Sequence, residues 1–139
     1  MFPILIFLIA IFSCNETQTK ENSNLKQDPK LQESIQRGAI VYEDFCMTCH
    51  LPDGKGVPQA FPPLANSDYL MNKRKESVQT IKYGMSGEIT VNGIKYNGAM
   101  APLGLSNEEV ADVMNYMSNS WGNKNDKMVT ESEVSKIQP

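Results

Sequence analysis

Histidine is almost absent from this sequence: His50 is the only one among 139 residues, beside three cysteines and one tryptophan. No GxxxxGK[ST] or GxGxxG segment is present, so the chain lacks the glycine-rich loops that cradle phosphates in nucleotide-binding proteins. No pair of carboxylates stands in a pattern typical of acid–base catalysis. A formal net charge of −3 does not give the basic surface that nucleic-acid binding requires. The length fits one domain rather than two.

The single histidine completes a short motif, Cys46-Met47-Thr48-Cys49-His50. The spacing C-x-x-C-H is the attachment signature of c-type haem, in which two thiols add to the haem vinyl groups. The two cysteines fall on one helical turn and point the same way, so His50 comes under the iron as the proximal ligand. Because there is no second histidine, bis-histidine ligation within this chain is excluded. The opposite axial position is filled by another residue or stays open.

Other chemistries of the motif fit less well. Structural zinc needs four Cys or His ligands, and this stretch offers three. A thioredoxin-like C-x-x-C site would need a surrounding βαβ pattern, which the sequence does not have. A disulfide between Cys46 and Cys49 is possible but strained. We therefore predict one haem c as the cofactor, bound covalently through Cys46 and Cys49.

The first twelve residues are almost wholly apolar. This run is too short for a transmembrane helix of about 20 residues but suits the apolar part of a signal peptide. Ser13 and Cys14 follow, and an apolar stretch ending in a small residue and a cysteine resembles a bacterial lipoprotein signal. The resemblance implies cleavage before Cys14 and lipidation of that cysteine. No Lys or Arg precedes the run and Phe12 is bulky for its position, so an ordinary signal peptide and an uncleaved anchor are the alternatives.

Composition also divides the chain. Residues 1–13 are expected to form the signal peptide. Residues 14–28 are expected to form a flexible tether, because this stretch has too few apolar residues to bury a core. Residues 29–122 would be the haem domain, and residues 123–139 a C-terminal tail with a short helix. The expected location is the periplasmic side of a bacterial membrane, since several acyl chains on one cysteine suffice for stable anchoring.

Local signals predict mostly helices and one hairpin. Asp28 and Pro29 combine a capping side chain with a first-turn proline, and Ser106 with Glu109 matches a capping box. Asn92-Gly93 is a strong signal for a type I′ hairpin turn. The expected elements are a helix at 29–48 with a possible break near Gly38, a loop at 51–64, helices at 67–72 and 75–83, strands at 88–91 and 94–96, a loop at 97–104, a helix at 106–121 and a helical turn at 130–137.

The sequence also indicates a second axial ligand. Of eight methionines, Met100 alone lies in a loop of small residues and proline, Gly98-Ala99-Met100-Ala101-Pro102. Small neighbours let the backbone approach a flat macrocycle, and the proline stiffens the loop. Met85, in Gly84-Met85-Ser86-Gly87, is the alternative ligand.

Taken together, these features resemble class I (monohaem) cytochrome c of the small bacterial periplasmic type, over residues 34–122. The matching motifs are Gly38-x-x-x-Tyr42-x-x-x-Cys46-x-x-Cys49-His50, then Gly54-x-Gly56 with Phe61-Pro62-Pro63-Leu64, and the segment from Gly87 to Met100. The resemblance implies an all-α cytochrome c fold. Its N- and C-terminal helices cross over the haem, and a small β-hairpin is inserted before the distal methionine loop.

The resemblance implies roles for further residues. Met100 would be the distal ligand, although this chain has Ala101 where many relatives have proline directly after the ligand. The carbonyl of Pro62 or Pro63 would accept the Nδ1 proton of His50. Gly38 and Tyr42 would pack against the last large helix near Tyr116. Candidate pocket walls are Pro62, Pro63, Leu64, Ile81, Val110 and Met114.

The expected function is electron transfer rather than enzyme catalysis. Ligation by His50 and Met100 leaves no coordination site for a substrate, and a methionine ligand raises the reduction potential. We expect a monomeric, membrane-tethered carrier that docks transiently with redox proteins at the haem edge and does not bind nucleic acid. One alternative is a dedicated haem subunit of a periplasmic dehydrogenase or reductase. Another is an open-site haem sensor or peroxidase-like enzyme, against which the lack of a distal histidine argues.

Overall fold

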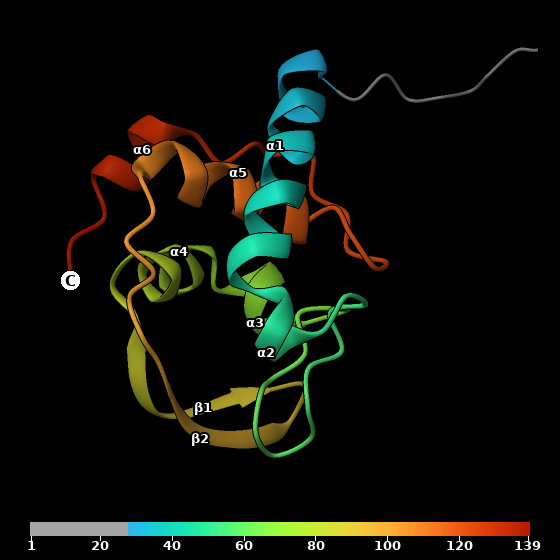
Figure 1. Ribbon diagram of the computed structural model, residues 1–139, viewed down its shortest axis with the longest axis vertical. Helices are drawn as coiled ribbons and strands as arrows, with labels where there is room; N and C mark the ends of the chain where they lie inside the picture. Colours follow the sequence, from blue (N-terminus) through green and yellow to red (C-terminus); the bar gives the residue numbers. More distant parts are fainter. Residues whose placement is uncertain (1–27) are drawn as a thin grey trace, which may run out of the picture.

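The computed structural model describes residues 28–139. The predicted signal peptide, Cys14 and the predicted tether as far as Gln27 lie outside the described residues. In chain order the elements are α1 (Pro29–Phe45), α2 (Met47–His50), α3 (Asp68–Asn72), α4 (Arg74–Tyr83), β1 (Met85–Val91), β2 (Ile94–Met100), α5 (Asn107–Met117) and α6 (Glu131–Ser135). Figure 1 shows β1 and β2 as a two-stranded layer at one end of the molecule, with α4, α5 and α6 on the other side.

Helix α1 begins where it was predicted and continues through Gly38. Asp28 caps it by accepting a hydrogen bond from the backbone N–H of Lys30 at 2.9 Å. The helix is interrupted at Cys46 instead, which ends α1 and begins α2. The possible break near Gly38 does not occur, and the predicted helix over 29–48 is broken inside the C-x-x-C-H motif.

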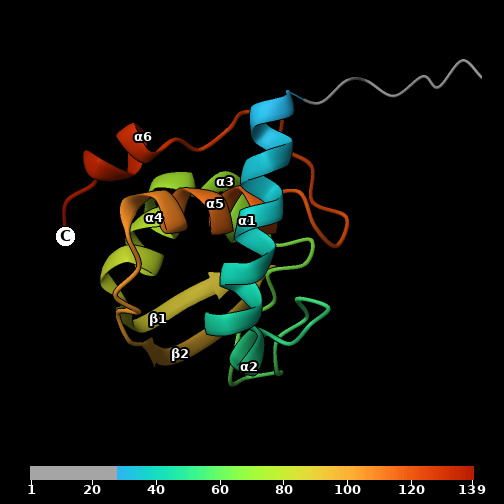
Figure 2. The same ribbon diagram turned by 45° about the horizontal axis from the view of Figure 1, so that its top comes forward.

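Gly38 lies where α1 meets α5, the pair of helices with the most extensive contact (Figure 2). A Cβ atom at Gly38 would overlap the backbone carbonyl of Asp112 and lie 2.9 Å from Cβ of Tyr116. The ring of Tyr42 packs on that of Tyr116 with centroids 5.4 Å apart. The expected contact of Gly38 and Tyr42 with the last large helix near Tyr116 is confirmed.

Helix α5 has the predicted capping box. Ser106 Oγ accepts from the N–H of Glu109, whose carboxylate accepts from the N–H of Ser106. The helix ends at Met117 rather than at Trp121. Side chains beyond its end satisfy the last carbonyls: Ser120 donates to Tyr116, and Asn123 donates to Met117. Such local bonds compete with further helical turns.

The hairpin is longer than predicted. Its ladder runs from the pair Val91–Ile94 to the pair Met85–Met100. Asn92 and Gly93 both have positive φ, 50° and 76°, as a type I′ turn requires. The prediction of a loop from residue 97 is wrong as far as Met100. Glycine and alanine have weak strand propensity, so residues 97–100 gave little signal.

Residues of the C-terminal segment join the same core as α4 and α5. Val129, Val134 and Ile137 are buried with Val78 and Met114. Thr130 caps α6 by accepting from the N–H of Glu133.

Candidate functional site

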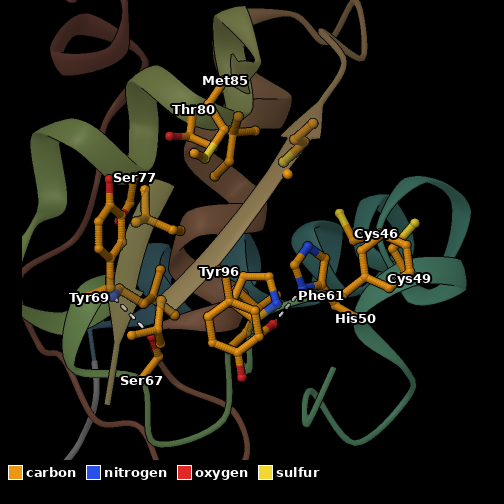
Figure 3. Close-up of a pocket in the computed structure, with 18 of the residues that line it drawn as sticks. Cys46, Cys49, His50, Phe61, Ser67, Tyr69, Ser77, Thr80, Met85 and Tyr96 are labelled. Atoms are coloured by element: carbon orange, nitrogen blue, oxygen red, sulfur yellow. Dashed lines mark hydrogen bonds between the residues drawn. The ribbon is translucent and has the colours of Figure 1, made fainter. Parts of the chain in front are cut away.

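A cavity of about 320 Å³ lies between the hairpin and the helices (Figure 3). One wall comes from the end of α1, from α2 and from the loop that follows. The facing wall is one side of the β1–β2 hairpin. Its lining is mostly apolar, and no Asp, Glu, Lys or Arg of residues 28–139 contributes to it. The cavity therefore suits a large apolar group.

The two cysteines and the histidine of the C-x-x-C-H motif, Cys46, Cys49 and His50, all line this cavity. The turn that presents them is short, because the N–H groups of Cys49 and His50 both donate to the carbonyl of Cys46, at 3.1 and 2.9 Å. Both thiols are free. Burial, followed by the neighbouring Cys49, raises the pKa of Cys46 to about 11. The Cys46 sulfur is thus a neutral thiol at pH 7.

The imidazole of His50 is oriented by a backbone carbonyl. Its Nδ1 lies 3.0 Å from the carbonyl oxygen of Pro62. A carbonyl oxygen only accepts, so the ring proton is on Nδ1 and the lone pair is on Nε2. Burial lowers the pKa of His50, and the bond to Pro62 opposes that shift. The neutral imidazole is the form that binds a metal.

Gly56 allows the loop after α2 to bring the carbonyl of Pro62 next to His50. Gly56 has φ of +63°, and its N–H donates to the carbonyl of His50 at 3.0 Å. A Cβ there would overlap the carbonyl of Phe61 and lie 2.6 Å from the carbonyl oxygen of Pro62. Only glycine allows this close approach. Pro62, Pro63 and Leu64 all line the cavity, where pocket walls were predicted.

The facing wall brings both candidate methionines to the cavity. Successive residues of a strand point to opposite faces, and one face of the hairpin supplies the lining side chains. Met85 and Met100 are directly opposite each other in the ladder, and both line the cavity. Met100 therefore closes a strand instead of lying in a free loop.

Two of the predicted pocket walls are wrong. Val110 and Met114 are fully buried in the core and do not line the cavity. Ile81 does line it, and Met117, one turn beyond Met114, lines it as well. The apolar face of α5 is buried, as predicted. Most of its side chains pack in the core between the helices and not against the cavity.

The sequence analysis named Gly98 as a small neighbour of Met100 but did not predict that it forms part of the cavity wall. Its φ is not positive, and an added Cβ would meet nothing nearer than the carbonyl oxygen of Ala60, at 4.0 Å. Nothing in the protein itself requires glycine here, whereas a flat group lying against this wall would. Gly87, opposite it in the ladder, also leaves open space. The pairing of two glycines on the cavity face becomes visible only once the strand register is known.

Comparison with known proteins agrees with this geometry. The family model for cytochrome c matches residues 35–121. The chain belongs to the cytochrome c family. Cytochrome c-552 of Thermus thermophilus is 38% identical over 110 residues, which covers 73% of this chain and 83% of that protein.

Dehydrogenase subunits also match this cytochrome c. The cytochrome c subunit of alcohol dehydrogenase (quinone) from Gluconacetobacter polyoxogenes is 31% identical over 115 residues, covering 73% of this chain and 22% of that subunit. The cytochrome c subunit of gluconate 2-dehydrogenase from Pantoea cypripedii is 30% identical over 107 residues, with 74% and 24% covered. The chain thus matches most of cytochrome c-552 but about a quarter of each of these subunits.

Membership of the family gives the cofactor and the general function. The protein binds one c-type haem covalently and acts in electron transfer. The cavity fits such a group: two free thiols and an oriented imidazole stand on one wall, and thioether sulfurs and side-chain-free glycines stand on the other. Within residues 28–139 no helix is long and apolar enough to cross a membrane.

Proposed function

We propose that this cytochrome c is a membrane-tethered periplasmic electron carrier in which His50 and Met100 are the axial ligands of the haem iron. The observation that carries the proposal is the pairing of the oriented His50 imidazole with a methionine on the opposite wall of one apolar cavity. The bound haem supplies one-electron chemistry between its ferrous and ferric states. Cys46 and Cys49 hold it by thioether bonds, and α1 and α5 pack together on the side of the core that adjoins it.

Met100 is favoured over Met85 by its surroundings. Met85 also borders a second, more open surface hollow that includes Glu76 and Tyr83, whereas Met100 does not. The carbonyl of Met100 packs closely on Gly84, where an added Cβ would lie 2.5 Å from it. Pro102 is in the same contact and limits the freedom of the chain after the ligand.

Catalysis of the peroxidase kind has little support in this cavity. Its lining in the described part of the chain contains no carboxylate, lysine or arginine. The one imidazole has its Nδ1 bonded to Pro62, and its Nε2 would bind the iron of the haem. The lining therefore offers no carboxylate, amine or second imidazole as an acid or base for a substrate, and we propose electron transfer rather than catalysis.

Two aromatic rings mark the proposed electron port. Phe45 and Phe61 line the cavity and remain 46% and 38% exposed. Exposed apolar groups at a pocket mouth are suited to brief protein contacts of small area. We propose that soluble or membrane-bound redox proteins dock here transiently and that the carrier is a monomer.

The dehydrogenase relatives favour a second candidate function. The cytochrome subunits of alcohol and gluconate dehydrogenases match this chain over one part of their length, so the domain could serve a fixed enzyme partner. Purification under mild conditions distinguishes the two: a carrier elutes alone, and a dedicated subunit elutes with a large dehydrogenase or reductase.

The tether is proposed from sequence, because Cys14 lies outside the described residues. Replacing it tests the anchor: Cys14→Ser should move the protein from the membrane fraction to the soluble periplasmic fraction. Retention of the variant in membranes would contradict lipidation at Cys14.

The ligand set is tested by optical spectroscopy of the protein expressed with haem-attachment machinery. The oxidised protein should have the weak sulfur-to-iron band near the red end of the spectrum, and the reduced protein should not bind carbon monoxide. Absence of the band with ready carbon monoxide binding would indicate an open iron site, and the sensor or enzyme alternative would then replace the carrier.

A further inference from the structure

One polar group in the cavity wall has no partner. Ser77, in α4, is 6% exposed and lines the cavity. Its Oγ is the one buried side-chain nitrogen or oxygen of residues 28–139 that makes no hydrogen bond. A helical serine often returns its hydroxyl to the carbonyl four residues earlier. Here the carbonyl of Lys73 accepts the backbone N–H of Ser77 at 2.8 Å but not its hydroxyl.

The hydroxyl of Ser77 belongs to a polar end of the cavity. Figure 3 shows Ser77, Tyr69 and Thr80 at the opposite end of the site from Cys46 and Cys49. Tyr69 and Thr80 bring further hydroxyl groups to this end, and both line the cavity. Among them, Ser77 contributes the hydroxyl that is buried and has no hydrogen-bond partner.

No charged side chain of the described chain lines this end of the cavity. The lining includes one titratable group from α3, Tyr69, whose pKa is raised by burial and then by Glu76. Lys73 lies outside the cavity wall, with Nζ 5.3 Å from the Tyr69 ring centre. Tyr96 is the titratable group supplied by β2, and β1 and α5 supply none to the lining. A buried anion here would have hydroxyl donors and no cation beside it.

We propose that Ser77 is a positioning residue that donates a hydrogen bond to a carboxylate of the haem. The inference rests on the proposed function, because it assumes a haem attached through Cys46 and Cys49. A c-type haem carries two propionate carboxylates on the side of the macrocycle opposite its two vinyl groups. Thioethers fix the vinyl side at the cysteines, so the carboxylates are directed to the end that holds Ser77. A carboxylate only accepts hydrogen bonds, which matches a donor without a partner.

The test follows the reduction potential of the haem-loaded protein as a function of pH. A donor bond stabilises the ionised carboxylate, so its loss in Ser77→Ala should move the pH at which that group ionises upward by about one unit. The inflection in the potential curve should move with it. Ser77→Thr keeps the hydroxyl and should follow the wild type. Infrared difference spectra of oxidised and reduced protein should show the same shift in the haem carboxylate bands.

Ser34→Ala is the matched control. Ser34 is a fully buried serine whose hydroxyl donates to Asp112, between α1 and α5. Its loss should lower stability and leave the potential curve unchanged. The proposal is overturned if Ser77→Ala matches the wild type in both measurements, if Ser77→Thr shifts as alanine does, or if Ser34→Ala produces the same shift.

The optical spectrum separates this inference from the proposed function. If the sulfur-to-iron band is present in wild type and Ser77→Ala while the curves coincide, Ser77 has no such role and the His50/Met100 carrier stands. If the wild type lacks covalent haem, the role of Ser77 falls with the haem. If only the band is missing, the Met100 ligand is wrong, and the comparison of Ser77→Ala with the wild type still decides the role of Ser77.

Discussion

The Nδ1 atom of His50 lies 3.0 Å from the carbonyl oxygen of Pro62, and Gly56 is the residue that permits this contact. The chain leaves His50, turns at Gly56 with a left-handed φ of +63°, and returns past Phe61 to Pro62. Gly56 thus allows the Pro62 carbonyl to fix the tautomer and the direction of the His50 imidazole.

Gly56→Ala should therefore affect both the fold and the haem. The left-handed conformation costs a non-glycine residue about 1–2 kcal/mol, and the overlap with Phe61 and Pro62 adds to that cost. We expect a lower free energy of unfolding in denaturant titrations and a changed reduction potential, because the Pro62 carbonyl must move.

Gly104→Ala is the control for backbone strain alone. Gly104 has φ of +72°, and an added Cβ would have open space around it. This variant should lose only the conformational cost and keep the wild-type potential. Equal effects of the two substitutions would show that Gly56 serves the turn and not the histidine.

Gly38→Ala should destabilise the protein, although alanine is the better helix former by about 1 kcal/mol. The added methyl overlaps the Asp112 carbonyl and crowds Tyr116. Overpacking of this kind typically costs about 1–3 kcal/mol. Thermal and denaturant unfolding measure the net effect. Ile40→Ala, at a position 63% exposed on the same helix, should stay close to wild type. A stabilised Gly38→Ala protein would mean that α1 and α5 separate at little cost.

The ion pair between Arg74 and Glu133 should make the free energy of unfolding depend on pH. Arg74 donates to its carboxylate from Nε and from one Nη, both at 2.6 Å. This bond, opposed by burial, lowers the pKa of Glu133 below its ordinary value of 4.5. A carboxyl with a lowered folded-state pKa stabilises the fold above its unfolded-state pKa. That contribution is lost as the pH falls below about 4.5 and through the folded-state pKa.

Glu133→Gln should lower the free energy of unfolding near pH 7 by about 1 kcal/mol, because the carboxylate is partly exposed and water screens the pair. Below the folded-state pKa the two proteins should converge. Glu131→Gln, at an exposed position on the same helix, is the control and should follow the wild type at every pH. A constant difference between Glu133→Gln and wild type across this range would rule out the ionic contribution.

The sequence predicted local structure well wherever all the residues that determine it lie in one short segment. Asp28 and Ser106 cap helices, and Asn92-Gly93 forms the hairpin turn. The C-x-x-C-H motif likewise carries its chemistry within five residues. The end of α5 was misplaced, because Ser120 and Asn123 satisfy its last carbonyls by bonds that no periodicity reveals.

The rest of the site depends on pairing between distant residues. Met85 faces Met100 only because the ladder continues past Gly98, where strand propensity is weak. The missing partner of Ser77 is a property of the assembled cavity. These features needed the register of the hairpin and the packing of α4 before they could be inferred.

The assignment of Met100 as the second axial ligand is the central claim, and Met85 provides its matched control, since both thioethers line one cavity from opposite positions of the same ladder. The measurement is the optical spectrum and reduction potential of haem-loaded Met100→Ala and Met85→Ala, with carbon monoxide added to each reduced protein. We predict that Met100→Ala keeps its covalent haem, loses the sulfur-to-iron band, binds carbon monoxide and has a lower potential, while Met85→Ala keeps the band. If Met85→Ala loses the band and Met100→Ala retains it, the ligand assignment is wrong.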